Sequence, residues 1–145
     1  MAYPEELVAP MREDLTSVGF NELRTIEDVD KALKTAQGTT LVVVNSVCGC
    51  AAAMARPGVK LSLQGDKKPE NLVTVFAGQD LDATAKAREY LFPYPPSSPA
   101  IALFKDGKLV HMIERRHIEG RPAQLIAENL KWAYNEFCGE GVISE

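Results

Sequence analysis

The sequence predicts an α/β fold in which a central mixed β-sheet carries helices on both faces. A run of strand formers, Leu41 to Val44, leads into an alanine-rich helical segment. Two strand–helix units of this kind imply crossovers that place strands parallel to one another. The Asp106-Gly107 pair between two apolar runs is a strong signal for a hairpin, which adds an antiparallel edge.

Composition limits both the size of the fold and its partners. At 145 residues and 46% hydrophobic, the chain fits one domain over residues 1–145 with a core that needs no disulfides. A net charge of −4, with no basic stripe, argues against nucleic acid as a partner. No basic leader and no run of about 20 apolar residues is present. We therefore expect a soluble, cytoplasmic protein with no membrane partner.

The first third of the chain predicts a helical N-terminal extension followed by a strand–helix unit. An apolar stripe over residues 5–17 indicates a helix ending near Gly19, and the stripe consists of Val8, Met11 and Leu15. Residues 20–24 form a short strand. Thr25 then caps a helix that ends at Gly38, with an apolar face made of Ile26, Val29, Leu33 and Ala36.

The middle of the chain holds the central strand and the helix that follows it. Residues 41–45 are apolar without alternation, which is typical of a strand buried on both faces. Residues 51–55 favour helix, and Pro57-Gly58 is expected to kink or end it. Residues 59–63 alternate like a strand, but we assign them to helix.

The remaining elements complete the sheet and its cover. Residues 72–77 form the next strand, and Asp80 caps a helix that buries Ala83, Ala87 and Leu91. A proline-rich loop covers 92–99. Strands over 100–104 and 108–113 form the hairpin. The last helix runs from about Arg121, with Pro122 early and an apolar face of Ile126, Leu130, Ala133 and Phe137.

Two thiols one residue apart, Cys48 and Cys50, stand where the central strand gives way to its helix. A thiolate at the first turn of a helix faces unpaired backbone N–H groups, which lower the thiol pKa. A single intervening residue can close a disulfide only with a strained backbone, which Gly49 permits. Strain would make such a disulfide easy to reduce. Three cysteines are too few for a disulfide scaffold, so a catalytic or metal-binding role is favoured.

The predicted elements follow the order of the thioredoxin layout, which is strand–helix–strand–helix–hairpin–helix. The cysteine pair also stands at a strand–helix junction, as in that layout. Proteins of that layout hold a cis-proline before the third core strand, beside the redox cysteines. Pro99 stands one residue before residues 100–103. The resemblance thus predicts a cis Ser98–Pro99 bond that aims the backbone of Ser98 at an incoming peptide or thiol, against the alternative of an ordinary trans loop proline.

Nearly the whole chain resembles the bacilliredoxin family. The motifs that carry the resemblance lie at residues 45–52, 55–57, 75–80, 83–90 and 95–99. These small bacterial proteins remove bacillithiol from mixed disulfides on protein cysteines, and weak disulfide isomerase activity is also attributed to them. The resemblance implies that Cys48 attacks and Cys50 resolves, with substrate contacts at Gly49, Ser98 and Pro99. It also implies S-thiolated proteins as partners, bacillithiol or another low-molecular-weight thiol as co-substrate, and no bound cofactor.

A zinc site is the main rival to a redox role. The two cysteines together with Cys138, His111 or His117 would supply the nitrogen and sulfur ligands of which zinc takes four. The usual spacing of two intervening residues is absent, however, and no second cysteine pair exists. Residues 111–117 are expected instead to alternate into solvent on an edge strand. We therefore expect no metal.

Several single residues admit two interpretations. Cys138 is either a small hydrophobe or a third redox cysteine, and Arg56 is either a helix-end cation or a partner of the thiolate. Trp132 and Tyr134 are expected to pack, and a loop carrying Phe92 and Tyr94 is a candidate wall for the thiol.

Taken together, these features predict a thiol–disulfide oxidoreductase that acts on mixed disulfides. The alternative is a non-catalytic metal-binding or interaction module that uses the Cys-Gly-Cys pair.

Overall fold

The structure of the chain is a computed structural model that describes residues 3–34, 37–47 and 49–138, with Cys50 described by its backbone alone. In chain order the elements are α1 (Glu5–Thr16), β1 (Asn21–Glu22), α2 (Ile26–Leu33), β2 (Thr39–Asn45), α3 (Gly49–Ser62), β3 (Asn71–Phe76), α4 (Leu81–Tyr90), β4 (Ala100–Lys105), β5 (Lys108–Ile113), α5 (Arg115–Ile118) and α6 (Ala123–Phe137). The expected order of strands and helices is confirmed, with α5 as an addition.

The strands form one mixed sheet in the order β1-β3-β2-β4-β5. β1, β3 and β2 run parallel, whereas β4 is antiparallel to β2 and β5 to β4. The hairpin between β4 and β5 turns at Asp106 and Gly107, both of which have positive φ. Such a turn matches the twist of the flanking strands, as the Asp-Gly pair predicted.

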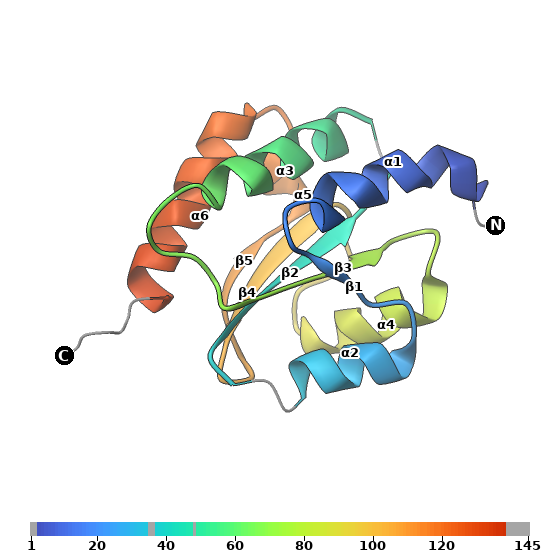
Figure 1. Cartoon of the computed structure of the whole chain (residues 1–145), viewed down its shortest axis with the longest axis horizontal. Helices are drawn as coiled ribbons and strands as arrows, with labels where there is room; N and C mark the ends of the chain where they lie inside the picture. Colours follow the sequence, from blue (N-terminus) through green and yellow to red (C-terminus); the bar gives the residue numbers. More distant parts are fainter. Residues whose placement is uncertain (1–2, 35–36, 48, 139–145) are drawn as a thin grey trace.

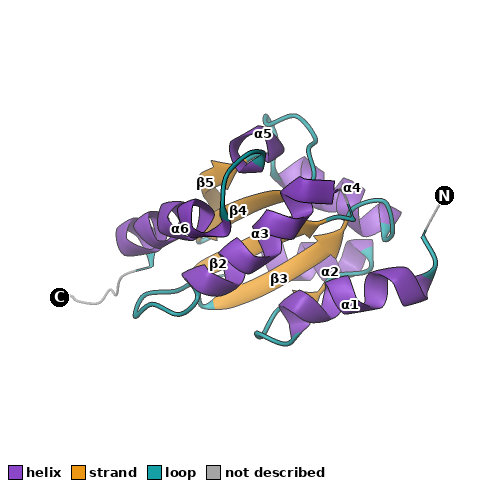
Figure 2. Cartoon of the chain, turned by 90° about the horizontal axis from the view of Figure 1, so that it is seen from above, coloured by secondary structure: helices purple, strands orange, loops and turns teal. Residues whose placement is uncertain are grey.

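Helices cover both faces of the sheet, with α1, α3 and α6 on one face and α2 and α4 on the other (Figures 1 and 2). Every residue of β2 is buried. Leu41 and Val43 point into the core beneath α3 and α6, while Val42 and Val44 point into the core against α2 and α4. The central strand therefore belongs to both cores, which explains its unbroken apolar sequence.

Helix α3 is longer than expected, because a tertiary contact overrides the local signal of a proline. Pro57 was expected to kink or end its helix, yet α3 continues through it to Ser62. Pro57 itself is exposed, and Val59 beyond it is fully buried in the core shared with α6. Burial of that second half maintains the helix.

Helix α2 matches the expectation at its cap but not at its first residue. Thr25 caps the helix by accepting from the N–H of Asp28, as predicted, whereas Ile26 was placed on the buried face and is 43% exposed.

The segment after β5 also corrects the prediction. β5 ends at Ile113, and residues 115–118 form the short helix α5 rather than an edge strand that alternates into solvent. The backbone N–H of Glu114 donates to Nδ1 of His117, which closes the first turn of α5, and Ile118 is fully buried. Among the described residues, no helix combines the length and the apolar character that a membrane span requires.

Candidate functional site

The candidate site begins where β2 ends at Asn45 and α3 starts at Gly49. Cys48 and the side chain of Cys50 lie outside the described residues, so their predicted pKa values and roles stay predictions. Between them, Gly49 is exposed and has φ +42, and an added Cβ would meet nothing within 4 Å. A left-handed φ is one that glycine adopts readily. The predicted need for glycine at this position is therefore matched by its backbone.

The Ser98–Pro99 peptide bond is cis, as predicted. β4 pairs with β2 so that Ala100 lies opposite Val44. Because the two strands are antiparallel, Pro99 and Ser98 continue toward the end of β2 from which the Cys-Gly-Cys segment leaves. Pro99 is buried, while Ser98 is half-buried. The topology thus brings the predicted proline loop and the predicted cysteine segment to the same edge of the sheet.

Arg115 of α5 holds this proline loop in place. Its Nη1 donates to the carbonyl oxygen of Ser98 at 3.2 Å, and its backbone N–H donates to Oγ of Ser97 at 3.3 Å. It also pairs with Glu119 at 3.0 Å. Sequence analysis did not predict this contact, because residues 111–117 were expected on a solvent-facing strand. Arg115 is one of the residues beside the site that sequence reasoning missed.

Arg56 does not have the first of the two roles considered for it, that of a helix-end cation, whereas its role toward the Cys48 thiolate stays a prediction. Its Nη1 donates to Oδ1 of Asn45 at 3.0 Å and to the carbonyl oxygen of Ser46 at 2.8 Å. Its Nε donates to Asp14 of α1 at 3.3 Å. Arg56 lies within α3 rather than at its end, and it binds the segment that leads into the cysteines. A polar Asn45 closing an apolar strand was the only signal in the sequence for this contact.

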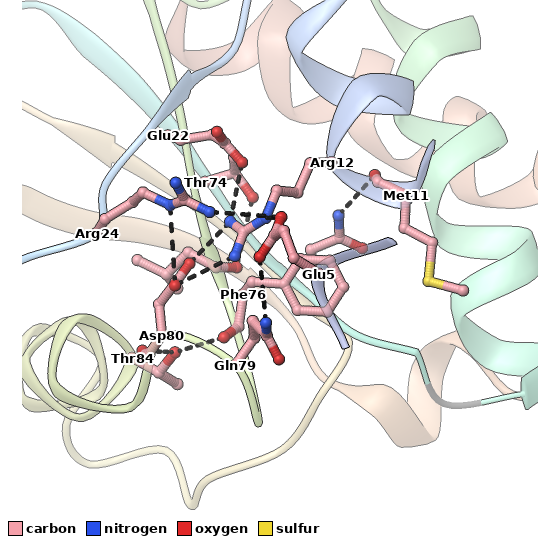
Figure 3. A network of polar contacts seen from close by, with 12 residues as sticks. Glu5, Met11, Arg12, Glu22, Arg24, Thr74, Phe76, Gln79, Asp80 and Thr84 are labelled. Carbon is pink, nitrogen blue, oxygen red and sulfur yellow. Dashed lines mark hydrogen bonds and ion pairs between the residues drawn. The ribbon is translucent and has the colours of Figure 1, made fainter. Parts of the chain in front are cut away.

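A buried arginine fastens α1 to the same edge of the sheet (Figure 3). The guanidinium of Arg12 donates to Glu5 at 2.9 Å, Glu22 at 2.9 Å and Asp80 at 2.8 Å, and it stacks over the ring of Phe76 at 5.2 Å. Burial disfavours its charge, but the hydrogen bonds that it donates to the three carboxylates outweigh burial and raise the pKa of Arg12. Arg12 therefore remains charged at its buried position.

Asp80 occupies the N-cap position of α4, as predicted, but its carboxylate makes no hydrogen bond to a backbone N–H of the helix. Both carboxylate oxygens accept from Arg12 instead. The capping interaction predicted for Asp80 is therefore wrong. The reason is tertiary: a buried guanidinium from α1 competes for the oxygens that would otherwise cap the helix.

Cys138 and Gly49 belong to opposite ends of β2. Thr39, at the start of β2, is close enough to Cys138 to influence the pKa of its thiol, whereas Gly49 follows the end of that strand. A seven-residue strand spans about 20 Å. Partial burial raises the pKa of Cys138. The structure therefore favours the small half-buried hydrophobe over a third redox cysteine.

The residues considered for a zinc site with the cysteine pair have separate partners. Nε2 of His111 lies 2.6 Å from Oδ1 of Asn129, and its ring packs 5.7 Å from that of Trp132. His117 instead closes the first turn of α5. Within the described part of the chain, no three residues of the metal-binding types form a group.

The aromatic residues divide into packed and exposed ones. Tyr134 is fully buried, as expected, whereas Trp132 is 55% exposed and packs against the ring of His111. Phe92 and Tyr94, the candidate wall for a thiol, are 81% and 42% exposed on the loop after α4. Their role toward a thiol stays a prediction.

Comparisons with known proteins agree with this geometry. A family model described as disulphide isomerase matches residues 3–138. A bacilliredoxin of Cytophaga hutchinsonii is 60% identical over 134 residues, which cover 92% of this chain and 98% of the relative. A bacilliredoxin of Halalkalibacterium halodurans is 57% identical over 136 residues, covering 94% of each chain.

Solved structures show a similar fold at low sequence identity. Mitochondrial thioredoxin 3 of Saccharomyces cerevisiae, in its oxidized form, matches 86% of this chain and 99% of its own with a TM-score of 0.56 at 14% identity. Thioredoxin O1 of Arabidopsis thaliana, in its oxidized state, matches 83% of this chain and 99% of its own with a TM-score of 0.55 at 16% identity. The fold is therefore thioredoxin-like, as the order of elements predicted.

Proposed function

This chain belongs to the bacilliredoxin family, and we propose that it removes a low-molecular-weight thiol from mixed disulfides on protein cysteines. Membership makes it a thiol–disulfide oxidoreductase of the thioredoxin fold. The observation that carries the proposal is that α3 begins at Gly49, between the two cysteines of the sequence, at the end of β2 toward which Ser98 and Pro99 lead. The name of the relatives points to bacillithiol as the thiol. Another small thiol would fit the same chemistry.

The reaction has two exchange steps. The thiolate of Cys48 attacks the small-thiol sulfur of the mixed disulfide, so that a Cys48–small-thiol disulfide forms and the protein leaves as a thiolate that takes up a proton. The thiolate of Cys50 then attacks the sulfur of Cys48, a Cys48–Cys50 disulfide forms, and the small thiol leaves. An external thiol reductant returns the pair to its dithiol form with two electrons. No cofactor is needed in either step.

The surroundings of the segment support this division of roles. The first turn of α3 offers backbone N–H groups that favour a thiolate, which suits Cys48 as the attacking group. Gly49 leaves open space where an adduct would lie. We propose that Ser98 and Pro99 contact the adduct from the opposite side. Weak disulfide isomerase activity is a second proposal, favoured by the description of the family model that matches the chain.

We further propose that the chain acts as one domain over residues 1–145, in the cytoplasm. Its partners are S-thiolated proteins, and neither nucleic acid nor a membrane is required. The rival, a non-catalytic module that holds a metal or a partner through its cysteines, predicts a bound metal and slow alkylation of Cys48. Rapid stoichiometric alkylation near neutral pH, with no metal by elemental analysis, would exclude the metal-bound form.

Single-cysteine variants test the mechanism directly. Cys48→Ser is expected to abolish removal of the small thiol from a mixed-disulfide substrate. Cys50→Ser should still accept the thiol but accumulate as a Cys48 adduct, which intact-mass measurement after one exposure to substrate would detect. If the adduct forms on Cys50 and Cys48 proves dispensable, the proposed roles are wrong.

A further inference from the structure

A polar cluster lies under the segment that leads into the cysteine pair. Asn45 at the end of β2 is 2% exposed, and its Oδ1 accepts from the N–H of Ser46 at 2.8 Å and from Nη1 of Arg56 at 3.0 Å. Its Nδ2 donates to the carbonyl oxygen of Met11 in α1 at 3.0 Å. These contacts fix the amide of Asn45 at both ends. A buried amide that is bonded at both its oxygen and its nitrogen has one orientation.

Arg56 connects this cluster to the helix that carries the cysteines. Nη1 donates to Asn45 and also to the carbonyl oxygen of Ser46 at 2.8 Å, two residues before Cys48. Nε pairs with Asp14 of α1 at 3.3 Å, and Asp14 also lies 3.5 Å from Lys60. The side chain of Arg56 is 12% exposed, whereas that of Lys60 is 39% exposed. The cluster thus joins α1, the end of β2 and α3 through one guanidinium.

We propose that Arg56 is a positioning residue for Cys48, and that α1 is part of the redox site because it holds Arg56 and Asn45 through Asp14 and Met11. This inference rests on the proposed function, since it concerns the reactivity of the attacking cysteine. The planar guanidinium binds two acceptors of the loop and one of α1 at once. Arginine presents five donors in a fixed fork, which suits it to bind several acceptors together.

The arginine acts on the loop in two ways. It holds the carbonyl of Ser46, so the chain enters the first turn of α3 in one direction. It also brings a positive charge to 2.8 Å from the carbonyl oxygen of Ser46, and the two residues from Ser46 to Cys48 span at most about 7 Å of chain. A unit charge at about 10 Å shifts a pKa by roughly half a unit to one unit at the dielectric constants typical of a protein surface. Arg56 should therefore help to keep Cys48 ionised.

The pH dependence of Cys48 reactivity tests this role. The parent protein for the test carries Cys50→Ser and Cys138→Ser, so that Cys48 is its one cysteine. The rate of alkylation by iodoacetamide is measured from pH 4 to 10. Arg56→Met should raise the midpoint of the rate profile by about half a pH unit, and Arg56→Lys should restore most of it because the charge is kept. Lys60→Met is the matched control, because Lys60 shares Asp14 but makes no bond to the described residues of the loop, and it should leave the midpoint in place.

A second neutral variant guards against misfolding. Arg56→Gln can still donate to one of the loop acceptors, and it replaces Arg56→Met if that variant fails to melt as a single transition by circular dichroism. An unchanged midpoint in the folded neutral variant, or an equal rise in Lys60→Met, would overturn the positioning role. If Cys48→Ser abolishes de-thiolation while the Arg56 variants titrate like the parent, only this inference fails. If Cys48→Ser keeps its activity, the proposed function fails instead.

Discussion

Gly58 in α3 lies so close to Ile126 in α6 that a Cβ at position 58 would stand 2.8 Å from both Cβ and Cγ2 of Ile126. It would also lie 3.2 Å from the carbonyl oxygen of Ala123. The two helices cover the same face of the sheet, and α3 begins at Gly49, between the two cysteines of the sequence. The absence of a side chain at Gly58 therefore sets how closely the helix of the redox site approaches α6.

Gly58→Ala should destabilise the protein by about 1–3 kcal/mol, because the added methyl group overpacks a β-branched neighbour. The sign of the change in unfolding free energy separates overpacking from helix propensity, since Gly→Ala in a free helix stabilises by about 1 kcal/mol. Urea unfolding measures the difference. Gly65→Ala is the control, because its Cβ would meet only the flexible end of Lys131 at 4.0 Å. A stabilised Gly58→Ala protein would show that the two helices separate without cost.

Arg12→Met should cost about 3 kcal/mol of the free energy of unfolding, because it leaves carboxylates that face each other without their shared cation. Of these, Asp80 and Glu22 are 14% and 25% exposed. Arg24→Met is the control, because the side chain of Arg24 pairs with the same Asp80 but is 48% exposed. An exposed pair is worth at most about 1 kcal/mol. Equal losses for the two variants, measured by urea unfolding, would refute the central role of Arg12.

The raised pKa values of two tyrosines predict that the folded protein loses stability at alkaline pH. A hydrogen bond of 2.6 Å to Asp30 raises the pKa of Tyr90 to about 12, and burial raises the pKa of Tyr134. Unfolded tyrosine ionises near pH 10, so the unfolded chain releases protons first and is favoured. This part of the stability is complete below about pH 10 and is lost as the pH rises toward 12.

Tyr134→Phe should therefore flatten the fall of the urea midpoint between about pH 10 and 12. The hydroxyl of Ser62, 2.9 Å from that of Tyr134, keeps its bond to the carbonyl oxygen of Val59 in the variant. Tyr94→Phe, on the exposed loop, is the control. The same alkaline slope in wild type and Tyr134→Phe would mean that burial of this phenol contributes nothing to the pH dependence.

Cys138→Ser should leave the rate of thiol exchange unchanged. The thiol lies at the start of β2, and partial burial raises its pKa, so little thiolate is present at neutral pH. Mass spectrometry of peptides after a short pulse of iodoacetamide at pH 7 should find Cys48 labelled well before Cys138. Faster labelling of Cys138, or a drop in exchange rate in the serine variant, would restore the third redox cysteine as a possibility.

The sequence by itself determined those features that depend on neighbours along the chain. The apolar run of β2, the Asp106-Gly107 turn and the cap at Thr25 are each set by a few consecutive residues, and the structure confirms them. The order of these elements then predicted the mixed sheet. The Ser98–Pro99 bond was predicted through a resemblance, because the sequence alone does not distinguish a cis from a trans proline.

Tertiary structure alone decided which residues meet across long separations. Arg12 reaches Asp80 over 68 positions and so removes the carboxylate from its local cap. Arg56 binds Asp14 over 42 positions. Pro57 stays helical because α6 buries the residues beyond it. The local sequence sets a preference for each segment, worth about 1–2 kcal/mol for an N-cap and about 3 kcal/mol for a proline inside a helix. Burial and charge pairing between distant segments outweigh these preferences. The surroundings of the cysteine pair depend on those distant contacts, and only the folded chain supplies them.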